Sequence, residues 1–311
     1  MRMNHDLRGC GNIGAAVTDS PLEAHRSNET RLAGLTIHRA LPVRGRRMVG
    51  PWCFLDRFGP LTFANGKPMD VGAHPHIGIQ TVSWLLDGEI VHHDTLGHDA
   101  PLRPGGVNIM TAGQGIAHAE ETPKRNSGRL SGVQLWVALP DAHRNRAASF
   151  QHVDAVPTLV LQGGLAQVIT GELGGTSSPA ERFSDLTGAD VEVRPGEAVT
   201  LPLRGEFEHA FFLLDGDCVF EGQDIEARTL YYLPPGRSEG EFKSREGARV
   251  LLLGGTPFGE KVLMWWNFVA RTTAEIQAAR RDWAEHRRFG KIPGYRGERM
   301  EAPEMMRLAE P

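Results

Sequence analysis

The chain has 311 residues, and because domains typically contain about 100 to 200 residues, this length predicts two domains. Its 37 glycines and 20 prolines favour many short strands joined by turns, so the composition predicts a mainly β protein. The formal net charge is −4, from 34 Lys and Arg against 38 Asp and Glu, and provides no basic field for phosphates. We therefore expect no direct binding of nucleic acid, whereas protein partners remain compatible with this composition.

The three cysteines indicate a reducing compartment. Cys10, Cys53 and Cys218 lie far apart and form no CxxC pair, which argues against both a disulfide framework and a zinc ribbon. The N-terminus lacks the apolar core of a signal peptide, and nowhere do 18 apolar residues follow one another. We expect a cytoplasmic protein that does not span a membrane.

The pattern of the chain changes near residue 31. Residues 1–30 are polar and show no periodicity, which predicts a flexible N-terminal extension. Short apolar runs separated by turn residues then predict strands, and a stretch with proline and charges at 139–147 marks a domain boundary. The predicted organisation is an N-terminal metal-binding domain over 31–150, a C-terminal domain over 151–290 and a tail over 291–311.

The second half of the chain repeats features of the first. Residues 84–89, WLLDGE, correspond to residues 212–217, FLLDGD, and each stretch follows a histidine-bearing segment. The second copy has only His209 where the first has His74 and His76. We therefore expect two similar β-barrels and a metal in the first barrel alone.

One helix is predicted near the C-terminus. Thr272-Thr-Ala-Glu275 matches a capping box, in which the first and fourth residues each satisfy a free backbone N–H of the other. Ile276, Ala279 and Trp283 then have the spacing of one buried helical face. The tail after this helix is rich in Pro and Gly and is expected to wrap around a barrel without regular structure.

The histidines form the main functional signal. Six of the 13 lie between residues 74 and 118, and the pairs His74-Pro-His76 and His118-Ala-Glu120 both have a spacing of two. In an extended strand such a spacing places both side chains on one face, so two neighbouring strands would direct four ligands to one point. Pro75 cannot donate to a β-ladder, which restricts its strand to an edge or a bulge. We predict that His74, His76, His118 and Glu120 bind one metal ion.

The ligand types indicate which metals fit. Three imidazoles and a carboxylate suit divalent Fe, Mn, Co, Ni, Cu or Zn better than Ca or Mg, which prefer oxygen ligands. Four protein ligands leave two octahedral positions for water, O₂ or substrate, so the site is predicted to be open. His92 and His93 are adjacent and face opposite sides, and His98 lies in a predicted loop; all three are expected in loop or rim positions.

Two motifs resemble the pirin family of the cupin superfamily: His74-Pro-His-Ile-Gly-Ile and Met110-Thr-Ala-Gly-Gln-Gly-Ile-Ala-His-Ala-Glu. The resemblance extends over about residues 35 to 295 and implies an all-β bicupin of two jelly-roll β-barrels with a short C-terminal helix. It also implies Fe(II) at His74, His76, His118 and Glu120. Two departures are Gln80, where cupins generally have Glu, and Ile109, where relatives often have an aromatic residue. We expect the first to spare metal binding and the second to reshape the pocket wall.

The resemblance implies a metal-dependent dioxygenase that cleaves flavonols with O₂, in the manner of quercetin 2,3-dioxygenase. Its substrates would be a small aromatic molecule and O₂. We add the hypothesis that Glu120, besides binding the metal, accepts the flavonol proton as a base. The alternative is a non-catalytic, redox-responsive regulator that binds transcription factors or metabolic enzymes. A cupin isomerase or sugar-binding protein fits the ligands but not the other pirin motifs.

Overall fold

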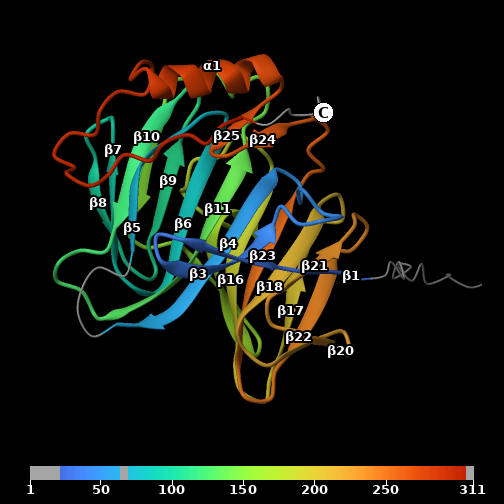
Figure 1. Ribbon diagram of the computed structural model, residues 1–311. Coiled ribbons are helices and arrows are strands. Elements are labelled where there is room, and N and C mark those ends of the chain that lie inside the picture. The colour runs from blue at the N-terminus through green and yellow to red at the C-terminus, as the bar shows by residue number, and fades with distance from the viewer. Residues whose placement is uncertain (1–21, 64–68, 306–311) are drawn as a thin grey trace, which may run out of the picture.

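The computed structural model describes residues 22–63 and 69–305 of the chain. In this part of the chain nearly all regular structure is β, and the strands form two antiparallel barrels that pack against each other (Figure 1). This architecture confirms the prediction of an all-β protein with two jelly-roll barrels. None of the helices in the described part is both long enough and apolar enough to cross a membrane.

The N-terminal barrel consists of two sheets that face each other. The larger sheet has the described strands in the order β12-β9-β6-β11-β4-β3-β2, and the smaller has the order β5-β10-β7-β8. The bounds of these strands are β2 Asn28–Leu32, β3 Leu35–Leu41, β4 Trp52–Thr62, β5 Asp70–His76, β6 Ile79–Gly88, β7 Ile90–Asp94, β8 Asp99–Leu102, β9 Val107–Thr111, β10 Ile116–Glu121, β11 Arg129–Ala138 and β12 Ser149–Val153.

The C-terminal barrel has the same plan. Its larger sheet has the order β1-β21-β18-β23-β16-β14-β13 with β15 beside β14, and its smaller sheet has the order β17-β22-β19-β20 among the described strands. The bounds are β1 Glu23–Arg26, β13 Thr158–Leu161, β14 Gly164–Leu173, β15 Thr176–Ser177, β16 Leu186–Val193, β17 Ala198–Pro202, β18 Glu208–Gly216, β19 Cys218–Phe220, β20 Gln223–Ile225, β21 Thr229–Leu233, β22 Glu239–Lys243 and β23 Ala248–Gly255.

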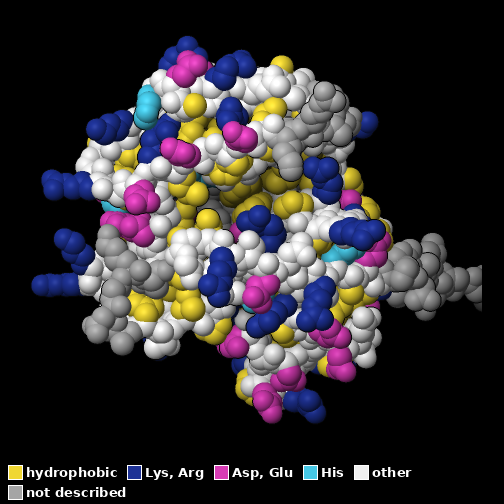
Figure 2. All heavy atoms as spheres, viewed as in Figure 1, with side chains coloured by type: hydrophobic (Ala, Val, Ile, Leu, Met, Phe, Trp, Pro, Cys, Tyr) yellow, Lys and Arg dark blue, Asp and Glu magenta, His cyan; other side chains and the backbone are white. Residues whose placement is uncertain are grey.

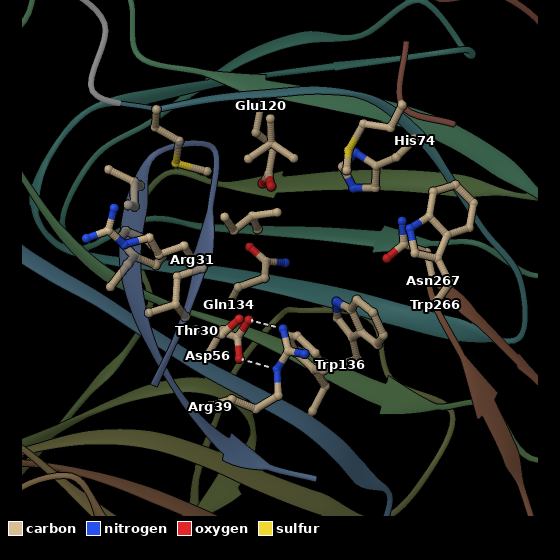
Figure 3. A pocket seen from close by; sticks show the side chains of 18 of the residues that line it. Thr30, Arg31, Arg39, Asp56, His74, Glu120, Gln134, Trp136, Trp266 and Asn267 are labelled. Carbon is tan, nitrogen blue, oxygen red and sulfur yellow. Dashed lines mark hydrogen bonds and ion pairs between the residues drawn. The ribbon is translucent and has the colours of Figure 1, made fainter. Parts of the chain in front are cut away.

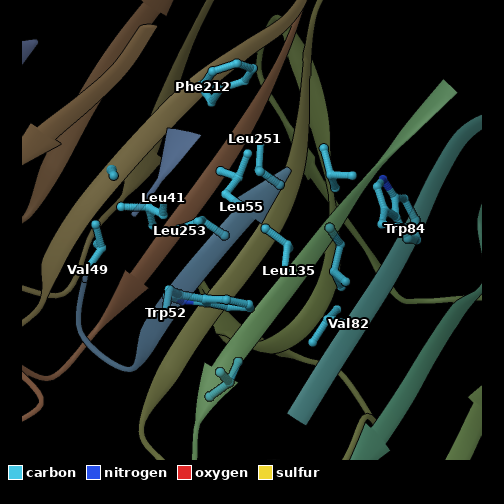
Figure 4. Close-up of a cluster of buried hydrophobic side chains, with 14 of the residues drawn as sticks. Leu41, Val49, Trp52, Leu55, Val82, Trp84, Leu135, Phe212, Leu251 and Leu253 are labelled. Carbon is cyan, nitrogen blue, oxygen red and sulfur yellow. The ribbon is translucent and has the colours of Figure 1, made fainter. Parts of the chain in front are cut away.

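The two larger sheets pack face to face and form a hydrophobic core between the barrels (Figure 4). Leu55 and Leu135 of the first barrel meet Leu251 and Leu253 of the second in this core. Strands such as β4 are buried on both faces, because one face lines the first barrel and the other contacts the second barrel. This double burial explains the continuous apolar runs in the sequence.

Tryptophans attach the barrels to each other by hydrogen bonds as well as by packing. Trp52 Nε1 donates to the Gly254 carbonyl at 3.0 Å, and Trp84 Nε1 donates to the Asp190 carboxylate at 2.6 Å. Both indoles are fully buried, so each N–H needs a partner, and each finds it in the other barrel. The two barrels are therefore joined by buried hydrogen bonds as well as by a shared core.

Both ends of the described chain cross from one barrel to the other. Strand β1 pairs with β21 of the C-terminal barrel, whereas β2 pairs with β3 of the N-terminal barrel. The prediction that residues 1–30 lack structure is therefore wrong for 23–26 and 28–30, and residues 1–21 lie outside the described part. The free edges of two sheets supply the backbone partners that this polar segment could not indicate by itself.

The C-terminal segment covers the N-terminal barrel. The hairpin of β24 (Leu263–Trp265) and β25 (Phe268–Ala270) leads into α1 (Thr273–Ala284), which lies across one end of the N-terminal barrel (Figure 1). The buried residues of this helix pack with Ile77, Ala117 and Phe268. The capping box at Thr272 is present, and Ile276, Ala279 and Trp283 are buried as predicted. Residues 291–305 of the tail contain no helix or strand, but Arg299 forms an isolated bridge with Ala73.

Strand pairing also bears on the domain division. Strand β12, which ends at Val153, pairs with β9 of the first barrel, and β13, which begins at Thr158, pairs with β14 of the second. We propose that the boundary lies between these two strands rather than at residue 150. By contacts, residues 263–290 belong with the N-terminal barrel, although the sequence places them in the C-terminal domain.

The interior of the C-terminal barrel is filled by aromatic side chains. Phe211 lies 4.6 Å from Phe220 and 5.0 Å from Phe242 between ring centroids, and it stacks on Tyr231 at 5.5 Å. His209 precedes Phe211 on the same face of β18 and is also buried. This filling occupies the space that a ligand would need, and it is the reason to expect metal chemistry in the first barrel alone.

Burial of His209 predicts a specific pH dependence of stability. Desolvation lowers the pKa of His209 to about 4, so the folded protein binds fewer protons than the unfolded chain between pH 6.5 and 4. The free energy of unfolding therefore falls as the pH is lowered through this window, by up to about 3 kcal/mol from this residue. Between pH 7 and pH 4.5, the free energy of unfolding should fall less in His209→Leu than in the wild type, as measured by urea unfolding at each pH. An equal loss in both proteins would contradict the prediction.

Candidate metal centre

The small sheet of the N-terminal barrel places the predicted ligands on neighbouring strands. In the pairing of β5 with β10, His74 lies directly opposite His118, and a bulge follows between His118 and Glu120. Strand β5 is the outermost strand of this sheet, which accommodates Pro75 at a position without a donated backbone hydrogen bond. The structure thus produces the strand arrangement that the two i, i+2 pairs predicted.

Three imidazoles converge inside the barrel. The Nε2 atoms of His76 and His118 are 3.1 Å apart, and the ring centroids of His74 and His118 are separated by 4.3 Å. The ligand atoms of His74, His76 and His118 all lie within 4.8 Å of one another, and all three residues are buried. Two nitrogens about 2.1 Å from one ion and at right angles to each other are about 3 Å apart. The three side chains therefore fit a transition-metal ion.

Glu120 belongs to a second, overlapping group. Its carboxylate clusters with His92 and His118 within the same 4.8 Å limit, rather than with His74 and His76. Glu120 nevertheless lines the same pocket as the three histidines, and Figure 3 shows its carboxylate directed into that pocket. The structure thus unites three of the four predicted ligands and places the fourth beside His118; the complete four-ligand set remains a prediction.

Backbone carbonyls fix the orientation of two of the imidazoles. His74 Nδ1 donates to the Gly72 carbonyl at 2.8 Å, and His76 Nδ1 donates to the Asn267 carbonyl at 3.0 Å. With the proton on Nδ1, the Nε2 atom of each ring has a free lone pair for a metal. Asn267 lies in the turn between β24 and β25, so the C-terminal segment takes part in building this site.

Burial sets the protonation of the site. Desolvation lowers the pKa of His74 to about 4 and the pKa values of His76 and His118 well below the usual range, so all three are neutral near pH 7. Desolvation also raises the pKa of Glu120, and the hydrogen bond from Ser83 only partly opposes this effect. A divalent cation would supply the positive charge that favours ionisation of this buried carboxyl group.

His92 is a residue of the site that sequence reasoning placed wrongly. It was expected in a loop or at the rim, but its side chain is buried and its Nδ1 lies 3.3 Å from Nδ1 of His118. The neighbouring His93 points to the other side, toward Asp99 and Glu121, in agreement with the expectation that at most one faces inward. The i, i+2 spacing of Ile90, His92 and Asp94 in the sequence was the signal that could have identified it, and the structure buries all three residues.

Neither of the two departures from the family pattern lines the pocket. Gln80 Nε2 donates to Thr111 Oγ1 at 3.0 Å and to the Glu181 carbonyl at 3.1 Å, and Gln80 is not among the residues that line the pocket. Ile109 packs in the core between the barrels, so the expectation that it reshapes the pocket wall is wrong. Both lie on strand faces that point away from the histidines, which sequence spacing within one strand cannot reveal.

The histidines open into a pocket of about 310 Å³. Figure 2 shows a hollow in the middle of the face viewed, bordered by hydrophobic side chains. The flat wall of the pocket is Trp136, which stacks on Phe54 at 3.9 Å and meets the edge of His76 at 5.1 Å between ring centroids. An ion pair between Arg39 and Asp56, with contacts of 2.7 and 2.8 Å, forms the polar end opposite the histidines.

Gln134 lies between the histidine end and the Arg39–Asp56 pair (Figure 3). Its Oε1 is 2.8 Å from Ser83 Oγ, which is also 3.1 Å from Glu120 Oε1. Its Nε2 is buried and has no hydrogen-bond partner among the described residues. A buried amide without a partner is unfavourable, so Gln134 is a candidate for bonding a polar atom of a ligand.

These features define a class of protein: a bicupin whose first barrel holds a buried histidine cluster and whose second barrel is filled by aromatic residues. The chain matches the pirin domain over residues 34–137 and the pirin C-terminal cupin domain over residues 188–290. It therefore belongs to the pirin family.

Named relatives and a solved structure agree with this assignment. A Pseudomonas aeruginosa protein named "putative quercetin 2,3-dioxygenase" is 42% identical over 271 residues, covering 87% of this chain and 86% of its own length. A pirin-like protein of Caulobacter vibrioides is 38% identical and covers 81% and 89%. The crystal structure of quercetin 2,3-dioxygenase from Acinetobacter baumannii is 41% identical and superposes with a TM-score of 0.90, covering 93% of this chain and 97% of that one.

Replacement of His118 tests the metal centre directly. His118 belongs to both ligand groups, so His118→Ala should reduce bound metal to less than a tenth of the wild-type content after purification. The barrel should remain folded, because the core between the barrels does not include this residue. Elemental analysis measures the metal, and His93→Ala on the outer side of β7 is the matched control. Unchanged metal content in His118→Ala would contradict the assignment.

Proposed function

We propose that this pirin binds one divalent transition metal, most favourably Fe(II), through His74, His76, His118 and Glu120, and acts as a flavonol dioxygenase. The observation that best supports this function is a cluster of neutral, buried imidazoles beside a flat aromatic pocket wall. The names of the 42% identical relative and of the 41% identical solved structure support the same activity. The reaction would be of the quercetin 2,3-dioxygenase type, with O₂ as the second substrate.

The residues of the pocket suit a planar aromatic substrate. Trp136 is held flat by Phe54, so its exposed edge and face form a rigid wall next to His76. A volume of about 310 Å³ lies at the lower end of the range for small-molecule pockets, which is about 300–1,000 Å³. Apolar side chains of Ile37, Phe58 and Met300 exclude water from the remaining walls.

Glu120 is the candidate base for the substrate hydroxyl. Its carboxylate is directed into the pocket, and Ser83 holds one of its oxygens in place. When bound, a redox-active ion at the three histidines would supply the electron transfer that allows O₂ to react with an organic molecule. The chain then contributes orientation of the aromatic ring, exclusion of water and removal of one proton.

The activity is tested with iron-loaded protein and quercetin. We expect consumption of O₂ together with loss of the flavonol absorbance, and neither change in His118→Ala. His93→Ala should retain both, because its side chain lies outside the pocket. Iron-loaded wild-type protein that binds metal but consumes no O₂ would contradict the dioxygenase. That outcome would leave the redox-responsive regulator, whose partner binding should differ between ferrous and ferric protein.

Gln134 is expected to contribute to substrate binding rather than to the chemical step. Gln134→Leu removes the amide but keeps the apolar volume, so we expect KM for quercetin to rise about tenfold with kcat nearly unchanged. The matched control is Gln151→Leu, because Gln151 bonds the Pro179 carbonyl on the surface and does not line the pocket. Steady-state kinetics at several flavonol concentrations separate the two parameters. A fall in kcat with constant KM would contradict this role.

A further inference from the structure

The hydrogen bond made by His118 differs from those of the other two histidines. His74 and His76 donate their Nδ1 protons to backbone carbonyls, whereas Nδ1 of His118 meets Nδ1 of His92 at 3.3 Å. On its other side, His92 Nε2 lies 3.2 Å from Oδ2 of Asp94. A buried row of His118, His92 and Asp94 therefore leads away from the histidine cluster.

The chemistry of this row favours one tautomer for His92 and one for His118. An ionised Asp94 only accepts, so the nitrogen facing it, Nε2 of His92, must be the donor. A neutral His92 with its proton on Nε2 then presents the Nδ1 lone pair to His118, and His118 must donate from its own Nδ1. His118 is left with a lone pair on Nε2, which faces the Nε2 lone pair of His76 at 3.1 Å, so this pair of tautomers requires a cation between the two atoms.

The other tautomer of His92 is unfavourable on both sides of its ring. A proton on His92 Nδ1 would place an Nε2 lone pair against the Asp94 carboxylate, where two acceptors would repel each other. It would also force the His118 proton onto Nε2, which would then have no lone pair for a metal. The geometry of the row therefore decides the tautomer of a ligand more than 20 residues away from either partner in the sequence.

Asp94 is firmly fixed in its position. Its side chain is fully buried and accepts the backbone N–H groups of Leu96 at 2.8 Å and His98 at 3.1 Å, and also Nδ1 of His98 at 2.9 Å. Burial opposes the ionisation of Asp94, but the hydrogen bonds from His92 and His98 outweigh it and lower the pKa of the carboxyl group. The anion at the end of the row is thus stable.

The position of His92 is also defined by packing and by strand pairing. Its ring stacks on Phe150 of β12 with centroids 4.4 Å apart and planes inclined by 15°. In the pairing of β7 with β10, Asp94 lies opposite His118 and His92 lies opposite Glu120. The sheet therefore brings the supporting pair beside the ligand pair by backbone register.

We propose that His92 and Asp94 are positioning residues of the metal centre, which hold His118 in the tautomer that directs an Nε2 lone pair toward the ion. This role rests on the proposed metal site and extends it beyond the four predicted ligands. Partners of this kind typically alter metal affinity by about 10- to 100-fold when they are removed.

The first test uses wild-type protein loaded with diamagnetic Zn(II), because a cation is needed between the Nε2 lone pairs of His76 and His118, and it does not depend on any variant. Long-range ¹H–¹⁵N spectra of the histidine rings report which nitrogen of each neutral imidazole holds the proton. We expect Nε2–H for His92 and Nδ1–H for His118. The Nδ1–H form of His92, or the Nε2–H form of His118, would overturn the proposal.

The second test compares His92→Phe with His92→Asn by Co(II) binding in competition with a chelator. Phe keeps the stacking on Phe150 but accepts no hydrogen bond, so Co(II) should bind about 10- to 100-fold more weakly. Asn places an acceptor oxygen near the former Nδ1 and should recover most of the affinity. His93→Phe, the same change one residue along β7, is the matched control and should bind as the wild type does. Circular dichroism verifies that each variant is folded.

A spectroscopic signature separates positioning from a general loss of stability. In the Co(II) form, the Nδ1 protons of the three ligand histidines should give three shifted, exchangeable proton resonances. In His92→Phe, the Nδ1 proton of His118 should exchange rapidly with solvent, whereas the Nδ1 protons of His74 and His76 should remain protected from exchange. Wild-type protein that does not bind Co(II) would overturn the metal centre itself. Tight wild-type binding with equal affinity and three protected resonances in folded His92→Phe would overturn the positioning role alone.

Discussion

The pairing of β5 with β10 is the constraint on which the histidine cluster and the proposed metal centre depend. This register sets His74 opposite His118, and the i, i+2 spacing then places His76 on the same inner face. A shift of one residue would turn every side chain of the strand to the other face of the sheet. Burying three imidazoles costs desolvation free energy. This cost is small here because the rings are neutral and because two of them donate hydrogen bonds to backbone carbonyls.

The second barrel supports the pocket of the first. Its aromatic interior makes it a solid body, and its large sheet buries the outer face of β4, β6 and β11. Those strands in turn supply Trp136 and Gln134 to the pocket from their inner face. The segment after the second barrel returns to the first and brings Asn267 to His76 and Met300 to the pocket wall. Among the described residues, the buried histidine cluster thus lies in the first barrel alone, although the two barrels share one plan.

Local sequence rules predicted some features well, because these features depend on nearby residues alone. The capping box at Thr272 and the buried face of α1 are contacts within four residues of the chain. His74 and His76 lie on the same face of β5 because side chains two residues apart in an extended strand point to the same side. His92 was missed because its adjacency to His93 showed only that one of the two faces inward. The partner that decides the question, His118, is distant in sequence.

The sequence by itself determined the all-β class, the two similar barrels, the pirin motifs and the candidate ligand residues, since periodicity and residue chemistry encode all of these. The tertiary structure alone decided that β1 joins the far barrel, that Ile109 faces the inter-barrel core and that Asn267 completes the environment of His76. It also decided that Glu120 lies nearest to His92 and His118. The physical reason is that strand alternation fixes which residues share a face, whereas the identity of what lies opposite that face depends on long-range packing.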